Sequence, residues 1–256
     1  MPNHVTNRLK LIGEQPAIDE CLEKIKLDEK GIGTIDFNKI IPMPASLDVT
    51  AGSEETNAIK AYLKATCPFN DTSICGIRRL DETLYLNILF KLAENDFLAK
   101  YSMENILKYD LTATDNTELI RKGEIYIDNL LQYGATTWYD WCRNNWGTKW
   151  NAYDFAPFEN NTITFCTAWS NVCELITRLS AMHPDLNFEY SWADEDFGSN
   201  VGTARIYAGK ATAYIPEIFS REAYEMAADI MGCSPEDYGL HFDKKKNNYV
   251  SSEDED

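Results

Sequence analysis

The sequence has few residues of the kinds that build metal and redox sites. It contains 3 histidines, which lie far apart in the chain, and 7 cysteines, none of them in a Cys-x-x-Cys pair. A zinc site is not expected, because such sites bring cysteine and histidine ligands together at short spacings. A Gly-x-Ser-x-Gly nucleophile motif and a complete dinucleotide-binding glycine motif are also missing. We therefore expect a non-catalytic protein with no metal and no cofactor.

Basic residues and long apolar runs are also scarce. The 24 Lys and Arg residues stand against 41 Asp and Glu residues, which gives a formal charge of −17. Direct nucleic-acid binding is not expected, since phosphate contacts depend on clustered Lys and Arg. No apolar run is long enough to span a bilayer and the first residues are polar, so we expect a cytoplasmic protein with free thiols and no membrane contact. The charge either keeps the protein soluble or provides a surface for a basic partner.

An aromatic motif between residues 137 and 153 contains four of the 6 tryptophans. Helical spacing places Trp138 and Trp141 on one face of a short helix, and Gly147 is suited to end it. A strand is expected from Trp150 onward. We interpret the cluster as core packing, because aromatic stripes at helical spacing are usually buried. The alternative is an exposed platform that stacks bases or sugars.

Polar residues around this motif form a candidate ligand site, which consists of Asp140, Arg143, Lys149, Tyr153 and Asp154. In this hypothesis the polar helix face recognises a ligand while the aromatic residues hold the frame. A second candidate, for partner binding, is the acidic run Asp194, Glu195 and Asp196 in a predicted turn. Calcium loops space their ligands at alternate positions and add a later bidentate glutamate, so this run predicts a solvated turn rather than a cation site.

The first half of the chain predicts a β-α-β opening followed by a helical insert. Alternating apolar residues indicate a strand over residues 4–12, Pro16 suits the start of a helix, and residues 34–41 are predicted as a second strand. The periodic segments that follow, up to Gly134, indicate helices. We therefore predict an N-terminal α+β region with a helical insert over residues 1–134.

The second half predicts the order strand, strand, helix, strand, strand, then an edge strand over residues 211–216 and a final helix. Ser170 and Ser220 are expected to cap the two helices. This order predicts an α+β fold, a ferredoxin-like antiparallel sheet with a helix on one face, over residues 135–242. Residues 243–256 are expected to be a disordered acidic tail. One strand face is expected to bury Ile163, Phe165, Thr167 and Trp169.

Several stretches carry a resemblance to a known family, namely residues 1–9, 36–44, 133–150 and 165–170. Together they resemble the uncharacterised Api-like proteins of phages and mobile elements, whose C-terminal half is described as a ferredoxin-like domain. The resemblance implies a phage, prophage or plasmid origin, and hence the cytoplasm of a bacterial host. It implies no catalytic residues.

These observations lead to three functional hypotheses. The first is an acidic binding protein of a phage or mobile element that occupies a basic surface on a host protein and inhibits a host defence. The second is a small-ligand-binding protein or enzyme with a pocket beside the motif from Trp138 to Trp150. The third is a structural homo-oligomer that pairs through a sheet edge. We favour the first.

Overall fold

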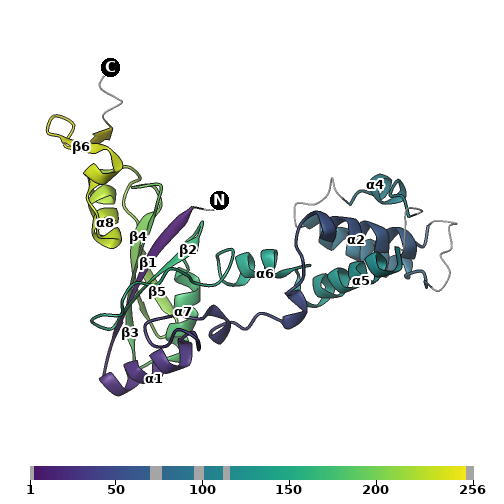
Figure 1. The fold of residues 1–256 in the computed structure, drawn as a ribbon, viewed down its shortest axis with the longest axis horizontal. Helices are drawn as coiled ribbons and strands as arrows, with labels where there is room; N and C mark the ends of the chain where they lie inside the picture. The colour runs from purple at the N-terminus through teal and green to yellow at the C-terminus, as the bar shows by residue number, and fades with distance from the viewer. Residues whose placement is uncertain (1–2, 70–76, 95–100, 112–115, 252–256) are drawn as a thin grey trace. The chain divides into compact units, whose positions relative to one another are not determined.

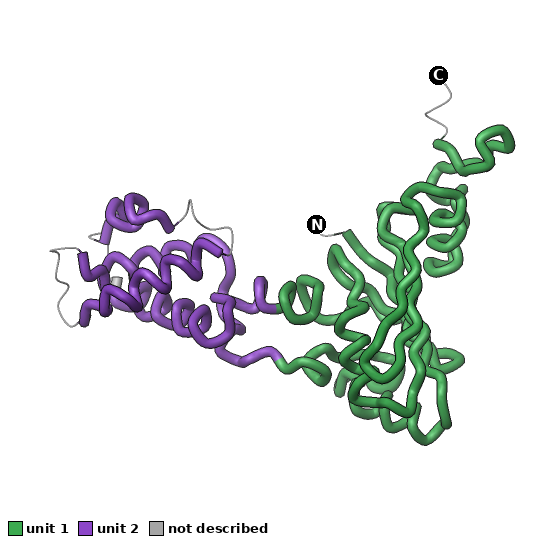
Figure 2. Tube along the Cα trace, turned by 180° about the vertical axis from the view of Figure 1, so that it is seen from behind, with its two compact units in different colours: residues 1–42, 142–256 green, residues 43–141 purple. Residues whose placement is uncertain are grey.

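A computed structural model of the chain describes residues 3–69, 77–94, 101–111 and 116–251. The chain forms two compact units, which Figure 2 colours separately. Unit 1 contains residues 1–42 and 142–256, and unit 2 contains residues 43–141. The beginning of the chain therefore belongs with its second half, which differs from the division expected after residue 134.

Unit 1 consists of one sheet, the helices that flank it and a C-terminal hairpin (Figure 1). Its elements are β1 (His4–Ile12), α1 (Gln15–Ile25), the 3-10 helix η1 (Phe37–Lys39), β2 (Thr162–Ala168), α7 (Cys173–Met182), β3 (Asn187–Asp194), β4 (Val201–Tyr207), β5 (Lys210–Tyr214), α8 (Arg221–Met231), the 3-10 helix η4 (Pro235–Tyr238), β6 (Leu240–Asp243) and β7 (Asn248–Ser251). The helix α6 (Trp138–Asn145) begins in unit 2 and ends in unit 1.

The main sheet has the strand order β2-β1-β3-β4-β5 and is antiparallel throughout. β1 lies second in this order, and its Leu9 is paired with Ile163 of β2 and with Tyr190 of β3. Because both neighbours run antiparallel to β1, β2 and β3 run parallel to each other and α7 connects them as a split β-α-β unit. The α+β class and the antiparallel sheet predicted from the sequence are confirmed.

Alternating burial gives this sheet one apolar face. In β1, Val5, Asn7, Leu9 and Leu11 are buried, and the residues that alternate with them are more exposed. The helix α7 covers this face, since the backbone N–H of Val172 at its start donates to the buried Tyr190 hydroxyl. The helix α8 packs on the opposite face, in a cluster with Ala193, Phe197, Val201, Ala223, Tyr224, Ala227 and Ile230.

Two segments predicted as strands have other structures. Residues 34–41 contain the 3-10 helix η1, in which the Asp36 carboxylate accepts from the Asn38 N–H at 3.0 Å. The Phe37 N–H donates to Asn151 Oδ1 at 2.9 Å instead of to a neighbouring strand. The segment from Trp150 makes one isolated bridge, between Tyr153 and Cys166.

The C-terminal segment is more ordered than its composition suggests. Residues 240–251 form the hairpin of β6 and β7, not a tail. The rings of Phe242 and Tyr249 meet edge to face across this hairpin, with their centroids 5.3 Å apart. The Asp243 carboxylate accepts from the backbone N–H of Lys245 at 2.7 Å and so closes the turn. The predicted tail is therefore wrong up to residue 251, and residues 252–256 lie outside the described residues.

Unit 2 is helical, as predicted for the insert. Its elements are the 3-10 helix η2 (Ala45–Leu47), α2 (Ser53–Thr66), α3 (Glu82–Leu92), α4 (Met103–Leu107), α5 (Asn116–Tyr133) and the start of α6. α2 and α5 pack closely at Gly123, where a Cβ atom would lie 2.2 Å from the Ala58 carbonyl oxygen. Across the described part of the chain, no helix combines the length and the apolarity that crossing a bilayer requires.

Candidate functional site

The residues predicted to surround the aromatic motif fall into different units. Asp140 belongs to unit 2, whereas Arg143, Lys149, Tyr153 and Asp154 belong to unit 1. Arg143 and Asp154 are exposed, and the other three are half-buried. The part of the predicted ligand site that can be described as one surface is therefore the part in unit 1.

The tryptophans of the motif differ in their burial. Trp141 and Trp146 are buried, and the Trp146 indole N–H donates to the Ile41 carbonyl at 2.9 Å. Core packing is therefore confirmed for these two residues. Trp138 and Trp150 are half-buried. The ring of Trp150 is thus available to form part of a surface, as the alternative interpretation required.

Lys149 places its ammonium group against two indoles. Its Nζ atom lies 4.5 Å from the centroid of the Trp150 ring and 5.0 Å from that of the Trp169 ring. A cation over the face of an indole is attracted by the ring quadrupole, and tryptophan gives the strongest such interaction. This pair of rings is therefore shaped and polarised to hold a cationic group.

Trp169 is held in an unusual backbone conformation. Its φ angle is +70°, and its side chain is 39% exposed although the strand pattern predicted burial. Its N–H donates to the Asn3 carbonyl at 2.9 Å, and the hydroxyl of Thr148 bonds both the N–H and the carbonyl of Ala168. A bulky residue in the left-handed region costs about 1–3 kcal/mol, and such strain concentrates at functional sites.

Tyr153 and His4 form a second aromatic pair. The His4 Nδ1 and Tyr153 Oη atoms are 2.7 Å apart, and Tyr153 Oη also lies 3.3 Å from the Thr167 carbonyl oxygen. Burial raises the pKa of Tyr153 to about 12, and the negative charges of Asp154 and Glu195 act in the same direction. The phenol therefore stays protonated near neutral pH and serves as a hydrogen-bond donor, not as a base.

The predicted acidic run divides into one structural and two exposed residues. Asp194 is 5% exposed, and its Oδ1 accepts from the Asp196 N–H at 2.9 Å and from Asn3 Nδ2 at 3.2 Å. Its carboxylate therefore holds the turn and faces away from solvent. Glu195 and Asp196 are exposed, and the Glu195 N–H donates to the His4 carbonyl at 2.9 Å. The two groups predicted separately thus meet at the start of β1.

We call this region the acidic aromatic surface and define it as His4, Lys149, Trp150, Tyr153, Asp154, Trp169, Glu195 and Asp196. It lies where β1 begins and β2 and β3 end, beside the mark N in Figure 1. Sequence reasoning found five of these residues but missed His4, Trp150 and Trp169 as site members. The sequence contained one indication of Trp150, because the alternative interpretation of the aromatic motif was an exposed platform that includes this residue. Exposed carboxylates beside indole faces are the groups that recognise lysine and arginine.

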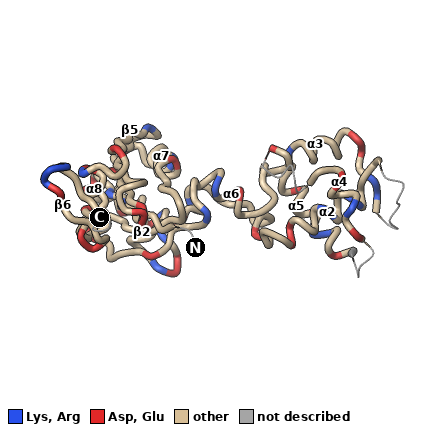
Figure 3. The backbone as a smooth tube through the Cα atoms, turned by 90° about the horizontal axis from the view of Figure 1, so that it is seen from above, with Lys and Arg blue, Asp and Glu red and all other residues tan. Residues whose placement is uncertain are grey.

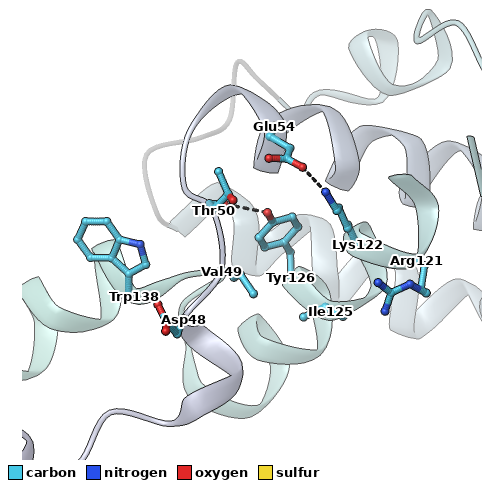
Figure 4. A pocket seen from close by; sticks show the side chains of 9 residues that line it. All are labelled: Asp48, Val49, Thr50, Glu54, Arg121, Lys122, Ile125, Tyr126 and Trp138. Carbon is cyan, nitrogen blue, oxygen red and sulfur yellow. Dashed lines mark hydrogen bonds and ion pairs between the residues drawn. The ribbon is translucent and has the colours of Figure 1, made fainter. Parts of the chain in front are cut away.

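A hollow in unit 2 is a separate candidate for ligand binding. It has a volume of about 490 Å³ and is lined by Asp48, Val49, Thr50, Glu54, Arg121, Lys122, Ile125, Tyr126 and Trp138 (Figure 4). The Tyr126 hydroxyl donates to the Thr50 carbonyl at 2.8 Å, and Lys122 pairs with Glu54. Tyr126 and Lys122 thus already have partners within the unit, while the Trp138 ring forms part of the wall of the hollow.

The thiols of the motif region have the properties of buried side chains. Burial raises the pKa of the Cys142 thiol to about 12, and it also raises the pKa of Cys166. Because the thiolate is the reactive form, these groups are poor nucleophiles. In the portion of the chain that the structure describes, no three His, Cys, Asp or Glu side chains are grouped to hold a metal ion.

Charge is spread over both units. Unit 2 contains 9 basic and 15 acidic residues and unit 1 contains 15 basic and 26 acidic residues, and Figure 3 shows the two signs interspersed. Neither unit carries the net charge alone. Recognition by charge therefore depends on local groups such as the acidic aromatic surface.

Part of unit 1 is similar to a described family. Residues 145–234 match the family model described as the ferredoxin-like domain in Api92-like protein. The crystal structure of a protein api92 from Yersinia pseudotuberculosis aligns over 86% of this chain and 100% of its own, with 12% identity and a TM-score of 0.34. No curated protein matches the sequence. Over residues 145–234 the chain is therefore similar to the ferredoxin-like domain of Api92-like proteins.

Proposed function

We propose that the chain is a non-catalytic binding protein that recognises a basic partner protein through the acidic aromatic surface. The observation that carries this proposal is the position of the Lys149 ammonium against the indoles of Trp150 and Trp169. The chain's own lysine occupies a place that suits a cation. The exposed carboxylates of Asp154 and Glu195 act on the neighbouring Tyr153, so negative charge and aromatic faces lie together.

The contacts expected with such a partner are individually weak and collectively specific. An exposed ion pair contributes about 0–1 kcal/mol and an exposed cation–π contact about 0.5–1 kcal/mol. A basic side chain that contacts the exposed part of the Trp169 ring while pairing with Glu195 or Asp196 gains both contributions. The charge of −17 accelerates the approach of a basic partner. Binding is therefore expected to weaken steeply as salt is added.

The resemblance to Api-like proteins supports a narrower version of this proposal. In that version the gene is carried by a bacteriophage or mobile element and the protein acts in the cytoplasm of the bacterial host. The partner is a host defence protein whose basic surface contacts phosphates, because a surface built for phosphates also attracts a protein of charge −17. Covering that surface inhibits the host protein.

Capture from bacterial lysate at increasing salt tests the proposal. The full chain is the bait, and the test variants are Trp169→Ser and the double variant Glu195→Gln with Asp196→Asn. We expect each to lose most of a captured protein that the unaltered chain retains at low salt. The matched control, Glu124→Gln with Asp128→Asn, removes the same charge from exposed positions of α5. Equal loss in the control, or capture insensitive to salt, contradicts the role given to this surface.

A second candidate function is small-molecule binding in the hollow of unit 2, whether or not catalysis follows. The observation that favours it is the combination of a volume of about 490 Å³ with the rings of Tyr126 and Trp138 and the charged groups of Arg121 and Lys122. A thermal-shift screen with nucleotides, metabolites and metal ions tests it. A stabilising compound whose effect disappears in Trp138→Ala supports this function, and the absence of any stabilising compound removes it.

A further inference from the structure

The two edges of the main sheet differ in how they are covered. At the β2 edge, Tyr153 bridges Cys166 and the Ala156 N–H donates to the Thr164 carbonyl at 3.0 Å. At the other edge, β5 pairs with β4, and all five of its residues are exposed. Within the described residues no segment pairs with the outer side of β5. Proteins usually cover or shorten such an edge, because it is a template for another strand.

The hairpin between β4 and β5 determines which backbone groups of β5 are free. Its loop is Ala208 and Gly209, whose φ angles are +44° and +76°, as in a type I′ turn. Tyr207 and Lys210, which flank the loop, therefore form a hydrogen-bonded pair, and hydrogen-bonded pairs alternate along the ladder. It follows that the N–H and carbonyl groups of Ala211 and Ala213 point away from β4. These groups are available to an added strand.

A hollow of about 410 Å³ adjoins the last part of β5. It is lined by Trp146, Gly147, Asn171, Val172, Cys173, Glu174, Trp192, Ala213 and Ile215. The Trp192 ring lies across Gly202 of β4, where a Cβ atom would be 2.4 Å from it, and so extends toward β5. Ile215 is 65% exposed, and Glu174 is an exposed acid at the rim. The hollow is therefore mostly apolar with one negative charge at its rim.

We propose that the β5 edge receives an extended segment of a partner protein, with a bulky apolar side chain seated in this hollow and a lysine or arginine two residues away on the same face of the segment. The free groups of Ala211 and Ala213 provide main-chain hydrogen bonds, and alternate side chains of the added strand face the hollow. Charge complementarity with Glu174, and with the exposed Glu217 beyond β5, selects the basic residue. This inference goes beyond the acidic aromatic surface, because it uses other residues and main-chain recognition.

A labelled synthetic peptide in which valine and lysine alternate at every second residue, with threonine between them, is the probe, because it places both side chains on one face of a strand. Fluorescence anisotropy with the full chain is the readout. Two other peptides separate side-chain charge from strand addition: one has the same composition with valines and lysines in separate blocks, and one is N-methylated at alternate backbone positions. We expect the alternating peptide to bind at least about tenfold more tightly than either. Equal binding of the three peptides would mean nonspecific attraction to an acidic protein and would overturn the proposal.

Variants of the chain locate the binding. Ala213→Pro removes an outward N–H without removing a β4–β5 hydrogen bond, and we expect it to lower the affinity for the alternating peptide at least about tenfold. Ala213→Ser keeps this N–H and is expected to retain binding. Glu174→Gln and Ile215→Ser leave the backbone unchanged and are also expected to lower the affinity for the alternating peptide. If the proline variant alters the circular dichroism spectrum, these two decide. Unchanged binding in both would overturn the proposal.

Two further measurements separate this surface from the alternatives. The double variant Glu195→Gln with Asp196→Asn is expected to bind the alternating peptide normally, so failure of the proposed function and failure of this inference are distinguishable. Light scattering tests whether a second copy of the chain occupies the edge. A dimer that Ala213→Pro converts to a monomer, together with no affinity for the peptide, would assign the edge to self-association and overturn the proposal.

Discussion

Replacing Tyr190 with phenylalanine tests whether a buried polar network supports the loop that carries Trp169. The Tyr190 hydroxyl donates to Asn7 Oδ1 at 2.5 Å and accepts from the Val172 N–H at 2.8 Å. Asn7 Nδ2 donates in turn to Thr167 Oγ1 at 2.9 Å. The network thus connects β1 and β3 to both ends of the segment that contains Trp169. It is one of the structural links between the sheet and the acidic aromatic surface.

The expected cost follows from the groups that the substitution leaves without a partner. The ring is unchanged in shape, so packing contributes little. The Val172 N–H and Asn7 Oδ1, in residues that are both buried, lose the hydroxyl. Each unsatisfied buried group costs about 1–3 kcal/mol, and we expect the free energy of unfolding of unit 1 to fall by about 3 kcal/mol. A loss of that size raises the equilibrium constant for unfolding of unit 1 about a hundredfold.

Native-state hydrogen exchange measured by mass spectrometry provides the assay. Amides of β1 and β3 are expected to exchange about a hundredfold faster in Tyr190→Phe, while amides of α2 and α5 serve as an internal reference and stay unchanged. The matched control is Tyr207→Phe, because that side chain is 53% exposed on the neighbouring strand. A change below about threefold in β1 and β3 would refute the reasoning that the hydroxyl supports this network.

Three further predictions follow from single contacts. Gly123→Ala places a Cβ atom 2.2 Å from the Ala58 carbonyl oxygen and should lower the stability of unit 2 by about 1–3 kcal/mol, measured by thermal unfolding. Burial raises the pKa of Tyr153 to about 12. Unfolded tyrosine ionises near pH ~10, so this contribution to stability is complete below that pH and is lost as the pH rises from ~10 to about 12, which urea titrations measure. Thr148→Val removes the hydroxyl that bonds the backbone of Ala168 and should lower the urea midpoint by an amount equivalent to about 1–3 kcal/mol.

Each of these has a control on the same element or residue. Glu124→Ala, beside Gly123 on an exposed position of α5, should change stability by less than about 0.5 kcal/mol. An equal loss in both variants would mean that the close approach of α2 and α5 is not the cause. Tyr153→Phe should make the loss of stability at high pH less steep. Thr148→Ser keeps the hydroxyl, and a loss as large as that of Thr148→Val would remove the hydrogen bonds as the explanation.

The features that sequence reasoning predicted correctly are those determined by neighbouring residues. Ser220 was predicted to cap the last helix, and its hydroxyl accepts from the Ala223 N–H at 3.1 Å. Gly232 ends that helix with a φ angle of +69°. The alternating pattern of residues 4–12 likewise identified β1. Caps and alternation act over a few residues, so a linear sequence contains much of the information needed to predict them. The cap predicted at Ser170 was wrong, because α7 begins after Val172 and the Asn171 side chain accepts from the Cys173 N–H at 3.0 Å.

Features that depend on distant residues were not predicted. Val5 of β1 pairs with Thr167 of β2, and the periodicity of either strand does not specify its partner. The boundary was expected after residue 134 because the sequence does not show that β1 pairs with strands of the second half of the chain. Ile35 and Phe37 alternate as a strand would, yet the side chain of a distant asparagine fixes the backbone there.

The same long-range pairing explains why the candidate site could not be assembled from the sequence. His4, Lys149, Trp169 and Glu195 belong to four separate stretches of the chain, and they meet because β1 lies between β2 and β3. The acidic aromatic surface therefore depends on the first strand as much as on the segment that matches the family model, which begins at residue 145. A deletion of residues 3–12 would remove the central pairing partner of β2 and β3. For this reason the binding activity that we propose must be tested in the full chain and not in the matched segment alone.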